Sequence, residues 1–397
     1  MPTTSDTALR DLPAVTDRDL SLIRGGLFYR AQRAVKLIHS DESNHVRRLT
    51  FAIAVGWMPL ILITALTHPE SLFSLLRDYR VHSRMLIAVP ALVMGEFLLE
   101  SRFRMVVVQI TRAGLLESAD LAKMDNVIGW IRRLRDSLLP ELTILLLIII
   151  HGALALKLQV DATPWLAQAS GPQLHVTMAG WYALVVSATM FQFLLGLALW
   201  QWLLWTLFAF KLSLLNLKLA PTHPDGHGGL GFLGLTPFAF TPVAFAASAV
   251  IAGTWHHEIL YHGANVMTFK LPAIVLAVIV ALIALAPLLF FVPKLAALRY
   301  AGILDYGILA QVQVGAFHEK WVLRGAGHED EFSSAPESRA LASFGQSYRR
   351  LEQLNPFPAD KAALITLALS VVIPMVPLLL SVIPIAVILK LLLKALR

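Results

Sequence analysis

Residues 271–293, LPAIVLAVIVALIALAPLLFFVP, contain no charged side chain, and Lys270 and Lys294 stand at either end of the run. At about 1.5 Å per residue, a helix of this length crosses the ~30 Å hydrocarbon layer of a membrane. Further apolar runs of similar length precede and follow it. The sequence therefore predicts an all-α, polytopic helical membrane bundle, because helices satisfy their own backbone hydrogen bonds in lipid.

The composition supports this fold class. Hydrophobic residues make up 57% of the 397 residues and charged residues only 15%, whereas a soluble domain contains about 25% charged residues. The chain has no cysteine, which excludes disulfides, thiolate nucleophiles and zinc or iron–sulfur sites held by cysteine. We attribute the net charge of +7 to the cytosolic face of a membrane protein and expect no nucleic-acid partner.

The apolar runs predict seven spans. They are residues 50–66, 84–99, 138–156, 178–210, 230–252, 271–292 and 362 to about 380. The N-terminal segment is polar and has no short apolar core followed by a cleavage site, so the first span is expected to be an uncleaved anchor. Because Pro374, Pro377 and Pro384 interrupt the last apolar stretch, six spans followed by a re-entrant C-terminal hairpin are the alternative.

Basic residues gather in the segments that a cytosolic N-terminus would place inside the cell. Segments 1–49, 101–137, 211–229 and 294–361 contain 25 of the 33 lysines and arginines, as the positive-inside rule requires. We therefore expect four parts. They are a cytosolic segment 1–49, a membrane bundle 50–293 with a cytosolic helical hairpin 101–137, a cytosolic helix and linker 294–361, and a C-terminal span with an amphipathic tail, 362–397.

The most distinctive loop, residues 221–234, joins the fourth and fifth spans with the sequence PTHPDGHGGLGFLG. Its candidate ligand-binding residues are His223, Asp225, His227, Gly228 and Gly229. Imidazole and carboxylate groups suit a divalent metal such as zinc or manganese, whereas glycine amides before a helix suit an anion. The alternative hypothesis is a tight corner in which glycines let two membrane helices pack closely.

A second histidine-rich string, WHHEILYH at residues 255–262, follows the fifth span. If it is helical, Glu258 and His262 share a face. Tyr261 occupies the place of the second histidine in the His-Glu-x-x-His zinc motif, so that motif is not complete. A weak surface metal site is one hypothesis, and interfacial residues at the membrane edge are the other.

Ionisable residues inside the expected spans are candidates for ion or proton passage, since each costs about 2.5 kcal/mol or more at the bilayer centre. These residues are Glu96, Glu141 and His151. The alternative for Glu96 is an ion pair with Arg102 or Arg104 near the cytosolic interface.

Aromatic residues and prolines add two expectations. Trp200, Trp202 and Trp205 are expected to form an aromatic belt at the inner membrane face. Pro237 and Pro242 are expected to kink the fifth span and to expose backbone carbonyls to a cavity, as in many transporters.

Three stretches together carry a resemblance to a known family. They are HPDGHGGLGFLG at 223–234, RDYRVHSRMLIAVPALVMGE at 77–96 and VVIPMVPLLLSVIPIAVILK at 371–390. With these stretches the chain resembles a family of uncharacterised bacterial inner-membrane proteins. The resemblance implies a bacterial origin and a shared multi-span fold, and it assigns no catalytic residue.

Three functions agree with these features. The leading hypothesis is channel-like or transporter-like passage of a solute or ion across the bacterial cytoplasmic membrane, because the chain has kinked spans and buried polar groups but no complete catalytic set. A membrane-embedded metal-dependent enzyme centred on His223, Asp225 and His227 is the second. The third is a non-catalytic scaffold or sensor whose basic helices bind a cytosolic partner or anionic lipid. The sequence leaves any cofactor and the oligomeric state open.

Overall fold

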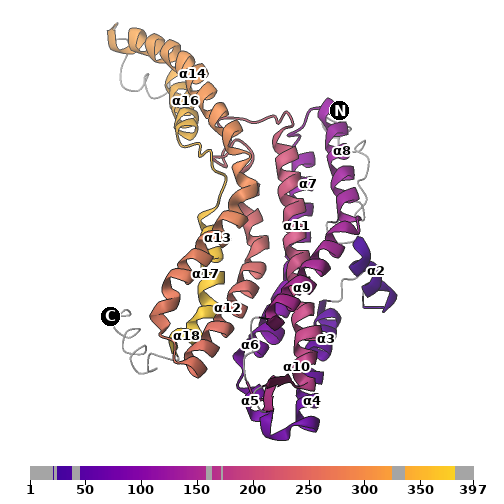
Figure 1. Cartoon of the computed structure of the whole chain (residues 1–397). Coiled ribbons are helices and arrows are strands. Elements are labelled where there is room, and N and C mark those ends of the chain that lie inside the picture. Colours follow the sequence, from indigo (N-terminus) through magenta and orange to yellow (C-terminus); the bar gives the residue numbers. More distant parts are fainter. Residues whose placement is uncertain are drawn as a thin grey trace.

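The described residues of the computed structural model are 21, 25–37, 45–157, 163–170, 173–323 and 336–380. Within them, six helices are long and apolar enough to cross a membrane, which confirms the predicted all-α membrane bundle (Figure 1). These helices are Val46–Thr67, Ala119–Leu154, Met178–Ser213, Gly231–His262, Val266–Leu289 and Lys361–Leu378. Residues 381–397, on which the choice between a seventh span and a re-entrant hairpin depends, lie outside the described residues.

The elements follow one another along the chain with few long loops. The helices are α2 (Gly26–Ala34), α3 (His45–Gly56), α4 (Met58–Thr67), η1 (Pro69–Ser71), α5 (Leu72–Leu76), α6 (Tyr79–His82), η2 (Ser83–Ala88), α7 (Val89–Arg112), α8 (Ser118–Arg135), α9 (Leu139–Lys157), α10 (Met178–Tyr182), η3 (Ala183–Ala188), α11 (Thr189–Ser213), η4 (Gly231–Phe240), α12 (Thr241–His262), η5 (Val266–Phe269), α13 (Lys270–Leu289), α14 (Val292–Phe317), η6 (His318–Leu323), α16 (Pro336–Glu352), α17 (Lys361–Val372), η7 (Ile373–Met375) and α18 (Val376–Leu380). Segments η2, η3 and η6 are π-helical, and the other η segments are 3-10 helices.

A short antiparallel hairpin marks one end of the bundle. Strands β1 (Ala167–Ser170) and β2 (Gln173–Val176) pair with Ala167 opposite Val176. We call this end, which also holds α5 and α6, the β1–β2 end. The opposite end, from which α14 leaves the bundle, is called the α14 end; α17 and α18 run from it toward the β1–β2 end (Figure 1).

The second expected span lies in the middle of the bundle, in the continuous helix formed by α6, η2 and α7. This helix contacts α12, α11, α3 and η4, and Leu92, Val93 and Phe103 on it are buried. It is not among the six apolar helices. One face of it meets other helices, and charged residues such as Glu96, which is 5% exposed, lie on that face.

Helices α7, α8 and α11 continue toward the α14 end, and aromatic side chains of α7 and α11 pack against each other there. The ring of Phe103 lies 4.9 Å from that of Phe208 and 6.1 Å from that of Trp205. The expected tryptophan belt is therefore wrong for Trp202 and Trp205, which are buried. Trp202 donates a hydrogen bond from Nε1 to the carbonyl oxygen of Ile283 at 3.0 Å. The two rings pack against those of Phe240 and Phe103 on neighbouring helices.

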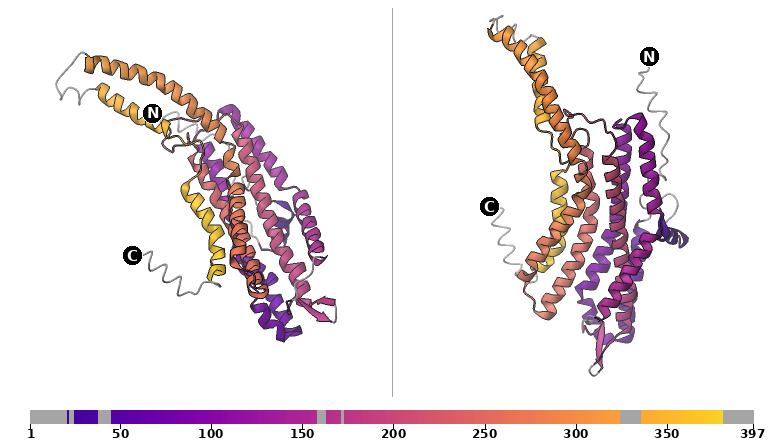
Figure 2. Two further views of the ribbon diagram at one scale, coloured as in Figure 1. Left: turned by 60° about the vertical axis from the view of Figure 1, so that its left-hand side comes forward. Right: turned by 45° about the horizontal axis from the view of Figure 1, so that its top comes forward.

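Helices α14 and α16 form a hairpin that projects away from the bundle (Figure 2). At its base, Gly302 packs against Pro221 and Leu351, and Arg299 donates from Nη2 to the carbonyl oxygen of Glu352 at 2.9 Å. The base of the hairpin is thus attached to the 221–234 loop, and Leu295 at the start of α14 packs in the apolar core of the bundle.

Candidate functional site

The 221–234 loop is organised around the carboxylate of Asp225. Its oxygens accept hydrogen bonds from the backbone N–H groups of His227 (2.9 Å), Gly229 (3.1 Å) and Gly231 (2.8 Å), and His223 Nδ1 lies 2.8 Å from Oδ1. Burial raises the pKa of this carboxyl, but the three backbone hydrogen bonds and His223 outweigh burial and leave the pKa below its ordinary value. Asp225 therefore holds the turn together.

The same loop joins the ends of α16 and α17 to the bundle. Asn355 donates its backbone N–H to the carbonyl oxygen of Gly226 at 2.9 Å, and His227 Nδ1 lies 2.9 Å from the carbonyl oxygen of Asn355. Gly228 has a φ of 64° and lies against Leu295 and Leu298, so a side chain there would be strained and would collide with α14. This geometry matches the glycine-packed corner.

The loop offers little to a metal or an anion. No group of three or more histidine, aspartate or glutamate side chains in the described part of the chain is placed to hold a metal ion. The amides of Gly229 and Gly231 already donate to Asp225, so they are not available to an external anion. The histidines of residues 255–262 also form no such group of metal ligands. His262 Nδ1 lies 3.3 Å from Glu258 Oε2, and both side chains are exposed.

The three intramembrane candidates do not lie together. Glu96 forms a buried ion pair with Arg48 at the start of α3, so the expected partners Arg102 and Arg104 were wrong. Glu141 accepts hydrogen bonds from the backbone N–H groups of Leu27 (2.9 Å) and Phe28 (3.1 Å) at the start of α2. His151 lies exposed on α9. No shared polar path therefore follows from these residues.

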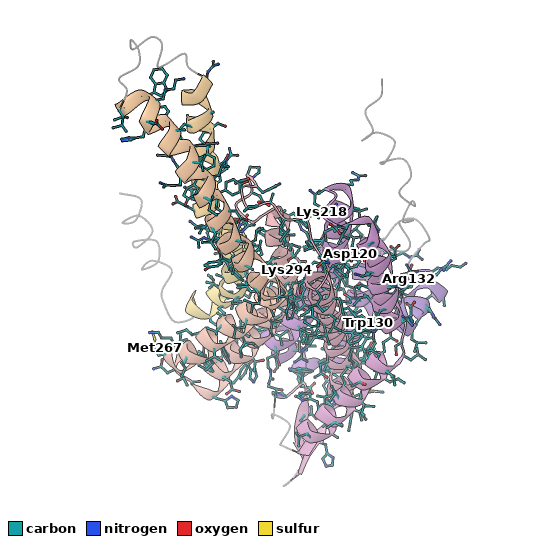
Figure 3. All side chains as sticks on the ribbon, turned by 90° about the horizontal axis from the view of Figure 1, so that it is seen from above. Asp120, Trp130, Arg132, Lys218, Met267 and Lys294 are labelled. Atoms are coloured by element: carbon teal, nitrogen blue, oxygen red, sulfur yellow. The ribbon has the colours of Figure 1, made fainter. Side chains whose placement is uncertain are left out.

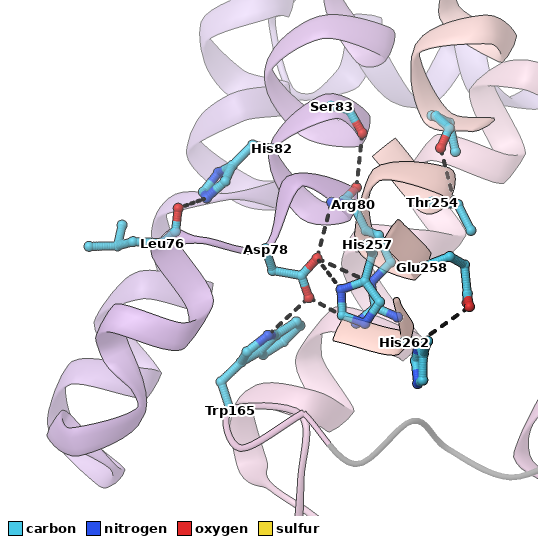
Figure 4. Close-up of polar contacts among 11 residues, drawn as sticks. Leu76, Asp78, Arg80, His82, Ser83, Trp165, Thr254, His257, Glu258 and His262 are labelled. Carbon is cyan, nitrogen blue, oxygen red and sulfur yellow. Dashed lines mark hydrogen bonds and ion pairs between the residues drawn. The ribbon is translucent and has the colours of Figure 1, made fainter. Parts of the chain in front are cut away.

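A different polar cluster, which we call the Asp78 cluster, lies at the β1–β2 end and consists of Asp78, Arg80, Arg84, Trp165 and His257. Asp78 and His257 are only 1% and 2% exposed. Asp78 Oδ1 accepts from the backbone N–H (3.0 Å) and Nε (3.1 Å) of Arg80, and Oδ2 accepts from Arg80 Nη2 (3.0 Å) and Trp165 Nε1 (3.1 Å). His257 Nδ1 lies 3.9 Å from Oδ1, as Figure 4 shows.

Local sequence features place each member of the Asp78 cluster. Asp78 is the N-cap of α6, where a carboxylate accepts from free backbone amides. Thr177 caps α10 and donates from Oγ1 to the carbonyl oxygen of Trp165 at 2.5 Å, which fixes the indole. Gly253 lets α12 approach η2, since a Cβ there would lie 2.2 Å from Ser83 Oγ. That close approach brings His257 to Asp78.

A cavity of about 170 Å³ adjoins the Asp78 cluster. Its walls come from α6, η2, η3 and the 163–166 turn, and they include Arg80, Arg84, Met85, Trp165, Leu184 and Ser187. The two π-helical segments thus face one cavity, and π-helical turns are frequent at functional sites. Arg80 is 18% exposed, so the cluster reaches the protein surface at this residue.

The charge of Asp78 is maintained by its neighbours. Burial raises the pKa of its carboxyl, but the hydrogen bonds and positive charge of Arg80, together with His257, outweigh burial and lower the pKa below its ordinary value. Asp78 is thus an anion that neutralises one nearby cation.

The sequence analysis did not single out Asp78, Arg80, Arg84 or His257 as a site. One signal was present: Arg77, Arg80 and Arg84 stand in a connection that the positive-inside rule would leave poor in basic residues. His257 belongs to the histidine-rich string at residues 255–262. It reaches the two arginines and Asp78 because α12 packs on η2.

Comparison with known proteins adds no assignment. No protein-family model, no curated protein and no solved structure matches this chain.

Proposed function

We propose that this protein is a carrier of the bacterial cytoplasmic membrane that takes up a small solute from the periplasmic side through the cavity beside the Asp78 cluster. One observation carries the proposal. Helices from three parts of the chain lose their regular backbone pattern at the level of this cavity: η2 and η3 are π-helical, and the first span is interrupted at Trp57. Irregular helices of this kind commonly line transporter sites.

Side chains satisfy the backbone groups that the interruption at Trp57 frees. Tyr182 donates from its hydroxyl to the carbonyl oxygen of Val55 at 2.6 Å, and Ser187 donates from Oγ to that of Gly56 at 2.5 Å. Both donors lie on α10 and η3 beside the cavity. Because these bonds join the first span to η3, a movement of one segment would change the cavity.

Between the level of the cavity and the α14 end, α7 packs on α12 and η4 through apolar residues. Leu92, Val93, Val243, Ala244 and Phe240 on these elements are all buried. A carrier needs its site to open to one side at a time, so a closed interior beside an accessible cavity supports alternating access and argues against an open channel.

The distribution of basic residues supports a cytosolic α14 end and therefore a periplasmic cavity. Figure 3, which views the molecule from the α14 end, labels Lys218 after α11, Lys294 on α14 and Arg132 on α8. Other basic residues at this end are Arg104, Arg112, Lys123 and Lys211, on α7, α8 and α11.

Flux into liposomes tests the proposal. Purified protein is reconstituted, and uptake of radiolabelled small anions, cations and neutral solutes is measured for the native chain and for Leu184→Trp, which fills the cavity. We expect uptake of at least one solute by the native chain and its loss in Leu184→Trp. The control is Gly152→Ala, since a Cβ at Gly152 meets nothing within 4 Å. Absence of flux for every solute class, with the protein folded, would overturn the proposal.

A sensor or scaffold is the second candidate, because the α14–α16 hairpin exposes an apolar stripe outside the six apolar helices. Its members are Tyr300, Leu304, Ile308 and Val312. This candidate predicts solute binding at the cavity without flux, and capture of a cytosolic protein that Ile308→Glu abolishes. The metal-enzyme alternative is not carried forward, because the oxygens of Asp225 are occupied by backbone amides.

A further inference from the structure

We infer that the cavity beside the Asp78 cluster binds a small oxyanion, a carboxylate or an inorganic oxyanion such as phosphate or sulfate, on the guanidinium groups of Arg84 and Arg80. The inference names the substrate class of the proposed carrier and depends on that proposal for transport, though not for binding.

The first argument is the balance of charge around the cavity. Arg80 and Arg84 both line it, and Asp78 is the one carboxylate among its lining residues. Both Asp78 oxygens already accept hydrogen bonds from Arg80, and Oδ2 also accepts one from Trp165. Asp78 therefore neutralises Arg80, and the charge of Arg84 remains in excess.

The second argument is the state of Arg84 itself. Its Nε is buried and contacts no hydrogen-bond acceptor among the described residues. A guanidinium stays charged in proteins and presents five N–H donors in a planar fork. A buried N–H group without an acceptor is costly, and a carboxylate or phosphate oxygen pair matches the guanidinium fork in geometry and charge.

The third argument is the shape and polarity of the cavity. A cavity of about 170 Å³ is large enough for a small oxyanion and lies below the usual size of pockets for larger ligands. Apolar side chains of Met85, Ala183 and Leu184 form much of the remaining wall. Because apolar walls lower the local dielectric constant, they strengthen the attraction between the guanidinium groups and an anion.

Binding is tested on the full chain, purified in detergent and freed of lipid, by titration calorimetry with acetate, butyrate, phosphate and sulfate. Potassium and choline, as salts of one reference anion, serve as cation controls. We expect saturable binding of at least one oxyanion and none of the cations. Arg84→Gln is expected to weaken the oxyanion dissociation constant at least tenfold, Arg84→Lys is expected to weaken it less, and Leu184→Trp is expected to abolish binding. The control Arg112→Gln removes an exposed arginine at the α14 end and should leave binding unchanged.

A second readout separates a binding role of Arg84 from a structural one. Without added anion, Arg84→Gln should unfold at the same temperature as the native chain or higher, because the variant removes a positive charge whose buried Nε has no acceptor among the described residues. Added oxyanion should raise the unfolding temperature of the native chain and not that of the variant. Destabilisation of Arg84→Gln without anion, together with unchanged oxyanion affinity, would overturn the inference.

The oxyanion has two sources, a free solute or the phosphate of an anionic phospholipid. The calorimetric titration is repeated with soluble short-chain phosphatidylglycerol. Competition between this lipid and phosphate at a site that requires Arg84 identifies the lipid as a source, and phosphate binding that the lipid does not affect identifies the free ion. Oxyanion binding without flux would support this inference and would overturn the proposed carrier. Cation flux that Arg84→Gln leaves unchanged would support the carrier and would overturn this inference.

Discussion

Buried and partly buried carboxylates in this chain are stabilised by different kinds of donor. Asp225 depends on three backbone amides, Asp78 depends on Arg80 and Trp165, and Glu96 depends on Arg48. In each case a charge that would be costly alone is paired with donors that fit it. The consequences of removing a partner therefore differ from site to site.

The Asp225 turn should weaken in acid. Burial raises the pKa of Asp225, but the hydrogen bonds to the carboxylate lower the pKa by more. The folded value therefore lies below the ordinary 3.8. The stabilising contribution is then complete above the pKa of the unfolded chain and is lost as pH falls through the lower folded pKa. Hydrogen exchange of residues 226–231 should accelerate below about pH 4 beyond its intrinsic pH dependence.

The Asp225→Asn variant should show weakened protection already at neutral pH, at a cost of about 1–3 kcal/mol. Asp305, exposed on α14, provides the matched control Asp305→Asn. Equal protection of the turn in both variants at pH 7 would contradict the role of Asp225.

The buried Arg48–Glu96 ion pair should matter for the stability of the fold, because a single charge left there has no partner. Glu96→Gln leaves Arg48 buried without its partner and should destabilise the protein by about 3 kcal/mol. The double variant Arg48→Met/Glu96→Leu should lower the free energy of unfolding less than Glu96→Gln does, because no charge is left unpaired. Chemical denaturation in detergent measures both, and Glu258→Gln, in an exposed pair, should change stability by less than about 1 kcal/mol. A double variant that costs as much as both single variants together would argue against a coupled pair.

At the scale of the elements, the contact between α12 and η2 joins the two halves of the Asp78 cluster. Gly253 is the closest point of this contact, with Ser83 Oγ 2.2 Å and the carbonyl oxygen of Tyr79 3.0 Å from the place of a Cβ. The π-helical turn of η2 and the glycine of α12 thus act together. Neither feature alone would bring His257 to Asp78.

Gly253→Ala should therefore separate α12 from η2 and destabilise the protein by about 1–3 kcal/mol. The double variant Gly253→Ala/Ser83→Gly removes the nearest colliding atoms and should recover part of the loss. Unfolding midpoints measure the effect, and Gly152→Ala is the control because its Cβ would meet no neighbour. Full stability of Gly253→Ala would mean that the helices are less closely packed than described.

At the scale of the whole molecule, the chain combines an apolar bundle with extensions at one end. The aromatic core of Phe103, Trp205 and Phe208 lies in the extension, and the Asp78 cluster lies at the opposite end of the bundle. We therefore expect the cavity and the projecting hairpin to lie on different sides of a membrane.

Topology is directly testable, since the chain contains no cysteine and a single introduced thiol is the only one present. In intact cells, His262→Cys at the β1–β2 end should react with a membrane-impermeant maleimide, and Gly307→Cys on α14 should react only after the membrane is permeabilised. This orientation is expected because basic residues are concentrated at the α14 end. The reverse pattern would place the cavity in the cytosol.

The apolar runs alone were sufficient to predict the membrane and the helical class. The run at 271–293 is long and uncharged, and no other structure than a helix or a closed barrel satisfies the backbone in lipid. The tight corner at residues 221–234 was also among the hypotheses, because its glycines are visible in the sequence. These features depend on neighbours along the chain.

The partners of Glu96, the burial of Trp202 and Trp205, and the Asp78 cluster depend on which helices lie side by side. Apolar faces that meet lipid and apolar faces that meet another helix have the same composition, because lipid tails are as apolar as leucine. Hydropathy therefore cannot distinguish them, and small residues such as Gly253 reveal a contact only once the facing atoms are known. Packing between distant segments forms the cavity that Arg80 and Arg84 line.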